Sequence, residues 1–172
     1  METADIPVTL RFKNYRLENV YFNTTAEQRA AVTAFWLREK AIADPREAER
    51  RAHEVVFMVY RDDTHELAGV STVGLQRLGD GRVYYAYRMF LREQDRAHYL
   101  MWSVIAATFD FLREFQHPEV RPLGVLHINE NPKLMRPGVR RFFARHGYRY
   151  LGQAPGGQDV WLAEFGAGLK RS

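Results

Sequence analysis

The pattern of apolar and polar residues first indicates a chain rich in strands. Short apolar runs and segments that alternate with a period of two are typical of buried and half-buried strands. The turn signals Asp62–His65 and Gly79–Gly81 separate three of these runs, which predicts an antiparallel meander. The strands predicted in this way are 8–12, 20–22, 55–60, 67–75, 82–91, 123–128, 148–151 and 160–165.

Helical spacing of three to four residues occurs in four other segments. Thr25 and Gln28 have the spacing of a capping box, and Asp95 is expected to be the N-cap of the longest helix. Pro137 suits a first helical turn, and Gly147 suits the residue that ends that helix. The helices predicted are 26–42, 45–52, 96–115 and 137–146.

The order of these elements predicts a mixed sheet. The helix 96–115 is apolar over much of its surface, so we expect it to pack against the sheet. It joins the strands 82–91 and 123–128, and a strand–helix–strand unit implies a parallel pair. The other connections favour antiparallel pairing. A length of 172 residues, 46% of them hydrophobic, fits one α+β domain over residues 1–172.

The amino-acid composition narrows the kinds of site that the chain can form. The chain has no cysteine, which excludes disulfides, thiolate metal sites and a cysteine nucleophile. Its histidines show no i, i+4 pair, so no metal site is predicted. No apolar run is long enough to span a membrane, and the start of the chain is acidic rather than signal-like. We therefore expect a cytoplasmic protein without a membrane partner.

The segment Arg140-Arg141-Phe142-Phe143-Ala144-Arg145-His146-Gly147-Tyr148 has a helix ending in an aromatic pair, three further residues, glycine and an aromatic residue. With the order of elements over about 8–165, it resembles the GNAT acyltransferase superfamily, whose members move an acyl group from acyl-CoA to an amine. The resemblance implies a mixed, mostly antiparallel sheet with one splayed parallel strand pair and helices on both faces. It also implies acetyl-CoA, or another acyl-CoA, as co-substrate and an amine acceptor.

In this family the donor lies where the two parallel strands splay apart. The resemblance places that gap between 82–91 and 123–128, and the amide arm of the donor against the backbone of Met89, Phe90 and Leu91. The same backbone is expected to stabilise the oxyanion.

The pyrophosphate loop departs from the family pattern, which is Arg/Gln-x-x-Gly-x-Gly/Ala. Arg92 and Ala97 preserve its ends, but Asp95 stands where the middle glycine belongs and is expected to repel phosphate. Arg92, Arg96 and His98 are expected to compensate as side-chain donors.

Further donor contacts are implied after the second parallel strand. Asn131 resembles the asparagine that contacts the pantetheine in the family. Arg136 and Arg140 begin the next helix and suit the phosphates near the adenosine, or an anionic acceptor. The acceptor surface is expected to come from residues 23–53 and the terminal hairpin.

For acid–base catalysis we look for titratable groups that face the gap. His127 is the candidate general base, followed by Tyr85 and Tyr87. Relatives place the tyrosine that protonates the leaving thiolate four residues before the glycine, where this chain has Phe143. Tyr148 and Tyr150 are the two candidate substitutes.

Other interpretations remain open. Lysine and arginine total 25, of which only four are lysine and 21 arginine. Arginines with exposed aromatics suit nucleic acid, so one alternative is a nucleic-acid-associated protein that acylates a modified nucleobase amine. A second is a non-catalytic binding module, and a third is a donor whose acyl group sits on a carrier. The aromatic strands 84–90 and 160–165 are candidates for a homodimer surface.

Overall fold

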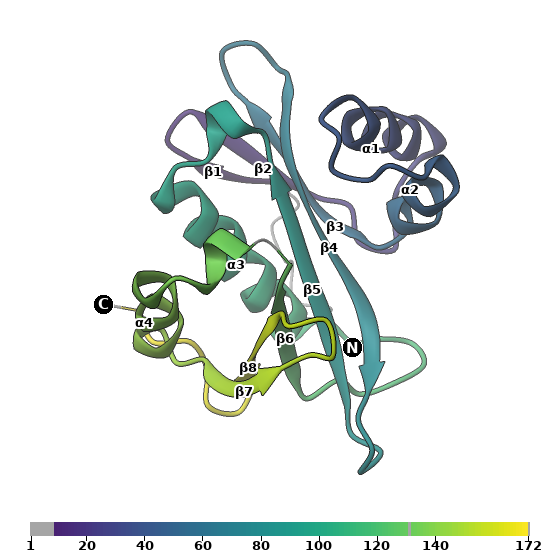
Figure 1. The fold of residues 1–172 in the computed structure, drawn as a ribbon. Helices are drawn as coiled ribbons and strands as arrows, with labels where there is room; N and C mark the ends of the chain where they lie inside the picture. The colour runs from purple at the N-terminus through teal and green to yellow at the C-terminus, as the bar shows by residue number, and fades with distance from the viewer. Residues whose placement is uncertain (1–8, 131, 172) are drawn as a thin grey trace. The chain divides into compact units, whose positions relative to one another are not determined.

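The computed structural model describes residues 9–130 and 132–171. These residues form four helices and eight strands in an α+β order (Figure 1). In chain order they are β1 Thr9–Phe12, β2 Tyr15–Asn19, α1 Ala26–Arg38, α2 Pro45–Ala52, β3 Val55–Arg61, β4 Leu67–Arg77, β5 Val83–Leu91, α3 His98–Glu114, β6 Gly124–Asn129, α4 Pro137–Arg145, β7 Arg149–Gln153 and β8 Asp159–Glu164.

The strands form one mixed sheet in the order β1-β2-β3-β4-β5-β6-β8-β7. β5 and β6 are parallel, whereas β1–β2, β2–β3, β3–β4, β6–β8 and β7–β8 are antiparallel. The predicted sheet, mostly antiparallel with one parallel pair, is confirmed. The parallel pairing runs from Tyr85 opposite Val125 to Tyr87 opposite His127, and β5 continues beyond it to Leu91.

The chain divides into two compact units. The first contains the residues up to Val73 together with Met89–Phe111, and the second contains Gly74–Arg88 together with the residues from Leu112. The strands β4 and β5 and the helix α3 therefore each contribute to both units. A single domain over the whole chain remains a prediction.

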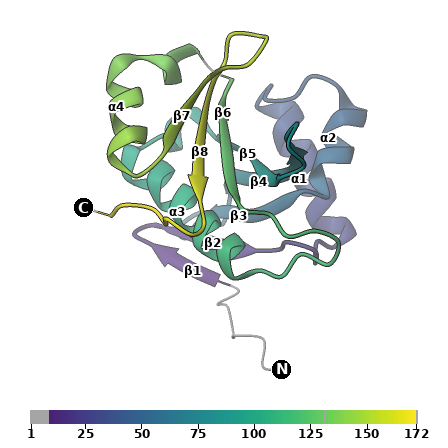
Figure 2. The ribbon, with the colours of Figure 1, turned by 90° about the horizontal axis from the view of Figure 1, so that it is seen from below.

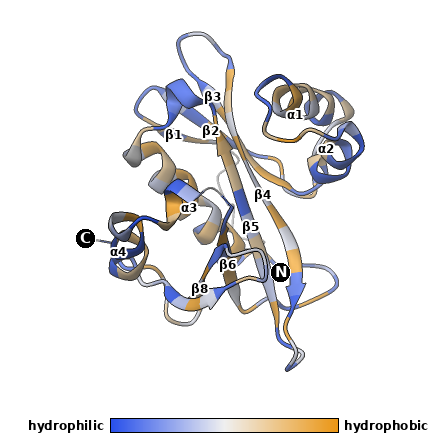
Figure 3. Cartoon of the chain, in the orientation of Figure 1, coloured by the Kyte–Doolittle hydropathy of each residue, from blue (hydrophilic) through white to orange (hydrophobic). Residues whose placement is uncertain are grey.

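In the first unit, helices lie on both faces of β3 and β4 (Figure 1). α1, through Phe35 and Trp36, packs in one cluster with Met58 and Val70, and α2 joins this cluster through its two alanines. α3 lies on the opposite face, where Thr108 and Ser71 share a buried hydrogen bond of 3.1 Å. α2 is largely hydrophilic (Figure 3), and only its two alanines are buried.

In the second unit, α4 covers one face of β6, β8 and β7 (Figure 2). Its buried Phe143 packs on Trp161 of β8, with ring centroids 5.5 Å apart. Tyr84, Leu126 and Leu162 form a cluster on the other face. As predicted, Gly147 follows the end of α4. Its φ of +94° lies in the region that favours glycine.

Two boundaries near the N-terminus differ from the predictions. The second strand is Tyr15–Asn19, not 20–22; Val20 and Tyr21 are buried but follow the strand. The strand predicted over 20–22 is therefore wrong, and Phe22 of this run is exposed. α1 ends at Arg38 rather than at 42, because Lys40 takes a left-handed φ of +57°. Val8 lies outside the described residues.

One further expectation is corrected. α3 begins at His98, so Asp95 is not its N-cap; Asp95 ends a short 3-10 turn that starts at Glu93. Tyr84, Tyr85 and Trp161 of the aromatic strands are buried within the chain, and a homodimer stays a prediction. Within the ranges described, no helix is both long and apolar enough to cross a membrane.

Candidate functional site

The predicted site residues are divided between the two units. Met89, Phe90, Leu91, Arg92, Arg96, Ala97 and His98 lie in the first unit. Tyr85, Tyr87, His127, Tyr148, Arg136 and Arg140 lie in the second. Asn131 and the side chain of His98 lie outside what the structure describes.

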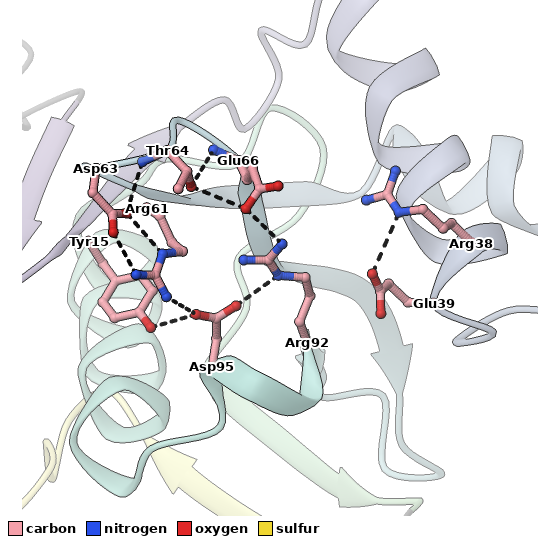
Figure 4. Close-up of polar contacts among 9 residues, drawn as sticks. All are labelled: Tyr15, Arg38, Glu39, Arg61, Asp63, Thr64, Glu66, Arg92 and Asp95. Carbon is pink, nitrogen blue, oxygen red and sulfur yellow. Dashed lines mark hydrogen bonds and ion pairs between the residues drawn. The ribbon is translucent and has the colours of Figure 1, made fainter.

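In the first unit, the turn after β5 is built around the carboxylate of Asp95 (Figure 4). This side chain is fully buried and accepts hydrogen bonds from the Tyr15 hydroxyl at 2.6 Å and from Arg92 Nε at 2.8 Å. A guanidinium nitrogen of Arg61 lies 3.4 Å from the same carboxylate. The sequence position of Asp95 suggested a negative charge that would repel phosphate. In the structure this charge is compensated by its hydrogen-bond and ion-pair partners.

Arg92 is held on three sides. Its guanidinium pairs with Asp95 and, at 3.3 Å, with Glu66. Its backbone N–H donates to the carbonyl of Ala68 on β4 at 2.8 Å. With only 7% of the side chain exposed, Arg92 is a buried structural cation in this arrangement.

The backbone of the turn is also engaged. The N–H of Asp95 donates to Arg92 O at 2.9 Å, that of Arg96 to Glu93 O at 3.3 Å, and that of Ala97 to Asp95 O at 2.9 Å. Arg96 donates its Nε to Leu91 O at 2.9 Å and lies over the ring of Phe90. A pyrophosphate loop needs backbone N–H groups aimed at the ligand. These three N–H groups are therefore already used within the turn.

Beside the turn, the first unit has a cavity of about 370 Å³. Helix α1 supplies an apolar wall, and Glu66 and Arg92 supply polar groups. This volume lies in the range of small-molecule sites. The residues that line it are Ala31, Ala34, Phe35, Arg38, Glu66, Leu67 and Arg92.

In the second unit, the strand register brings three site side chains into one row. Tyr87 lies opposite His127, and His127 lies opposite Trp161. The imidazole ring is 4.9 Å from Tyr87, 4.8 Å from Phe143 and 6.2 Å from Tyr148, between ring centroids. The predicted catalytic residues His127, Tyr87 and Tyr148 are thus brought together, whereas Tyr85 packs near His117 and Phe165.

This aromatic enclosure determines the charge of His127. Burial lowers the pKa of its imidazole from 6.5 to about 3. The ring is therefore neutral at physiological pH and binds an additional proton poorly. Such a group is better suited to hydrogen bonding than to the general-base role that its residue type suggested.

Buried polar atoms gather around His127. His127 Nδ1, Asn129 Oδ1 and Trp161 Nε1 have no hydrogen-bond partner among the described residues. Asn129 follows His127 on the same face of β6, and its amide nitrogen donates to Leu134 O at 3.3 Å. Sequence reasoning missed Trp161 because its place opposite His127 depends on the register of β6 and β8.

Burial favours the protonated form of two tyrosines of this unit. Burial raises the pKa of Tyr148 and raises that of Tyr85 to about 12. The ring of Tyr148 lies 5.1 Å from that of Phe143, which occupies the position expected for the acid. Tyr148 is thus placed and protonated as a candidate proton donor.

The arginines of α4 differ in their environment. Arg140 makes two hydrogen bonds to Asp159, at 2.7 and 2.9 Å, and Tyr150 donates to the same carboxylate. The guanidinium holds the pKa of Asp159 below its ordinary value. Arg136 is the N-cap residue and is exposed, so it is the more accessible of the two predicted phosphate contacts.

Other constellations are limited. Throughout the chain as described, no group of three or more histidine and carboxylate side chains is arranged to hold a metal ion. Arginines in both units pair with carboxylates, for example Arg11 with Asp62 and Arg82 with Asp80. The arginine excess therefore has an internal use and does not by itself indicate nucleic acid.

No protein-family model matches the chain, and no curated protein matches its sequence significantly. Solved structures do match. A ribosomal-protein-S5-alanine acetyltransferase from Vibrio fischeri aligns with a TM-score of 0.61 and 13% identity, over 91% of this chain and 94% of its own. A GNAT-family acetyltransferase from Bacillus cereus aligns at 0.55 and 10%, over 87% and 96%. A ribosomal L7/L12 α-N-protein acetyltransferase in complex with coenzyme A aligns at 0.57 and 12%, over 92% and 97%. The chain therefore has the fold of the GNAT acetyltransferases.

Proposed function

We propose that the chain is an N-acyltransferase that moves an acetyl or other acyl group from a thioester to an amine by direct transfer. The fold supports this class of reaction, and one of the similar structures is a complex with coenzyme A. The observation that carries the proposal is the buried cluster of His127, Asn129 and Trp161. These neutral hydrogen-bonding groups lie at the parallel strand pair, where the resemblance to the GNAT superfamily places the thioester.

The reaction joins the amine nitrogen to the acyl carbon and breaks the carbon–sulfur bond. Tyr148, which burial keeps protonated, gives its proton to the departing thiolate. His127 acts as a neutral hydrogen-bonding group. The proton of the attacking amine leaves to solvent.

Release of free thiol tests the proposal directly. Because the chain has no cysteine, a thiol reagent reports only product. We expect thiol release from acetyl-CoA or acetyl-pantetheine that depends on an added amine, in a panel of small amines and peptide N-termini. Acetylated amine should form in equal amount by mass spectrometry. Absence of amine-dependent release with every thioester and amine would contradict the proposal.

A further inference from the structure

A cavity of about 700 Å³ lies in the second unit, beside the segment that links α3 to β6. This volume falls within the range of small-molecule sites. The lining begins in the last turn of α3 and continues through residues 115–117 and 120–123, and Phe165 and Gly166, which follow β8, complete it. Every one of these residues belongs to the second unit, so the composition of the cavity depends on that unit alone.

The segment between α3 and β6 is held by backbone hydrogen bonds. The N–H of Leu123 donates to Val83 O on β5 at 2.9 Å, and Leu123 O accepts from the N–H of Phe165 at 3.0 Å. Nearer to α3, the N–H of Glu119 donates to His117 Nδ1 at 3.2 Å. The segment that lines the cavity is therefore tied to the sheet and to itself, as a largely preformed site requires.

Aromatic side chains make up part of the lining. They are those of Phe115, His117 and Phe165. The buried ring of Tyr85 supports two of them, at 6.3 Å from His117 and 6.2 Å from Phe165 between ring centroids. Leu123, also in the lining, is 42% exposed and adds apolar surface. Aromatic walls favour a ligand with a flat apolar ring, because rings stack or meet edge to face at such distances.

The charged part of the lining is mainly basic. Its one carboxylate, Glu114, lies 3.3 Å from Arg113, which also lines the cavity. Arg121 is exposed and makes no ion pair with a described residue, and Glu119 of the same segment is not in the lining. His117 accepts a hydrogen bond at Nδ1, so its neutral ring carries the proton on Nε2 and is a donor there. Two guanidinium groups against one carboxylate suit an anionic ligand.

We infer that this cavity is a second ligand site, which binds a small aromatic carboxylate. The aromatic side chains contact the ring of the ligand, and Arg121 and Arg113 bind its carboxylate. A guanidinium group binds a planar carboxylate through two parallel hydrogen bonds, which a neutral amide of the same shape cannot accept as strongly. The inference goes beyond the proposed acyl transfer, because His127, Trp161 and Tyr148 are not in this lining.

Calorimetry on the full chain tests the preference for an anion with two probes, indole-3-acetate and indole-3-acetamide. They share the ring and the shape and differ in the charge of the end group. We expect one-to-one binding of indole-3-acetate with a Kd below about 1 mM, and binding of the amide that is at least about fivefold weaker. Equal affinities for the two probes, or no binding of indole-3-acetate at about 10 mM, would overturn the inference.

Arg121→Gln tests the role of the exposed guanidinium, since it removes this charge without breaking an ion pair among the described residues. The variant should bind indole-3-acetate at least about fivefold more weakly and lose most of the advantage of the carboxylate over the amide. Arg145→Gln, at an exposed arginine of the same unit outside the lining, is the matched control and should keep the parent affinity. Equal affinities of the two variants for indole-3-acetate would contradict carboxylate binding by Arg121.

Gly166→Trp tests the location of the site. Gly166 lines the cavity, and an added Cβ there meets nothing within 4 Å, so the larger side chain takes up space in the cavity without a clash at its base. Affinity for indole-3-acetate should fall at least about tenfold. Gly79→Trp, in the same unit and with nothing within 4 Å of an added Cβ, is the control. Equal affinities of these two variants would overturn the assignment of the site, whereas the acyl transfer is tested separately by thiol release.

Discussion

The hydroxyl of Tyr15 donates a hydrogen bond of 2.6 Å to the carboxylate of Asp95, across 80 residues of sequence. Both groups are buried, and the pKa of the Tyr15 phenol is raised to about 12 by burial and by this carboxylate. The contact fixes the turn after β5 to the second strand. It makes the segment that the sequence identified with a pyrophosphate loop part of the buried interior.

Asp95→Ala should lower the free energy of unfolding by about 3–5 kcal/mol, because it leaves the buried Arg92 with a single partner and strands the Tyr15 hydroxyl. Tyr15→Phe, which leaves the ion pair intact, should cost only about 1–2 kcal/mol. Urea denaturation measures both. Asp80→Ala, in an exposed pair, is the control and should change little. A cost for Asp95→Ala no greater than that of the control would contradict a structural role.

His127 should make the stability of the fold depend on pH. Its pKa is depressed from 6.5 to about 3, so the stabilisation is fully present above pH 6.5 and is lost as the pH falls toward 3. Between pH 7.5 and 4.5 this group alone should account for a loss of about 2–3 kcal/mol. Urea denaturation of His127→Gln should show a pH dependence smaller by that amount. His53→Gln, at an exposed position, should retain the dependence of the parent chain.

Tyr148→Phe should lower kcat by about 100-fold if its proton reaches the thiolate. The rings of Tyr148 and Phe143 are neighbours, with centroids 5.1 Å apart, so the double variant Tyr148→Phe/Phe143→Tyr should recover at least tenfold. Thiol release measures both. Tyr150→Phe serves as the control, because the Tyr150 hydroxyl is occupied by Asp159. Unchanged turnover in Tyr148→Phe would exclude it as the acid.

Gly147→Ala should destabilise the chain by about 1 kcal/mol or more. Gly147 has a φ of +94°, where an alanine is strained, and an added Cβ would lie 3.3 Å from the backbone nitrogen of Lys170. Thermal unfolding measures the effect. Gly79→Ala, where an added Cβ meets nothing within 4 Å, is the control. Equal melting temperatures for the two variants would show that this turn tolerates a side chain.

Local signals predicted the fold well because they depend on neighbouring residues. The capping box of Thr25 and Gln28 is present, and Pro137 begins α4 as expected. The segment after Asn14 was harder to predict, because Val20 and Tyr21 are buried although they lie after the strand and not in it. Apolar content alone does not distinguish these two uses.

The candidate site was predictable only where the strand period decides it. Alternation correctly placed His127 and Asn129 on one face of β6. The enclosure that lowers the pKa of His127 comes from Phe143 and Tyr148, which are supplied by other elements. The partners of Asp95 are likewise distant in sequence, so its chemistry was invisible before the fold was known.

Each compact unit is assembled from separated stretches of sequence, because the chain passes from one to the other within β4, β5 and α3. No single cut in the polypeptide can separate the two units from each other. An N-terminal fragment that stops at Arg88 lacks Arg92 and Asp95, and the complementary fragment lacks Tyr84, Tyr85 and Tyr87. A cut at Arg88 therefore divides both units, and protease nicking there reports on the integrity of the two together.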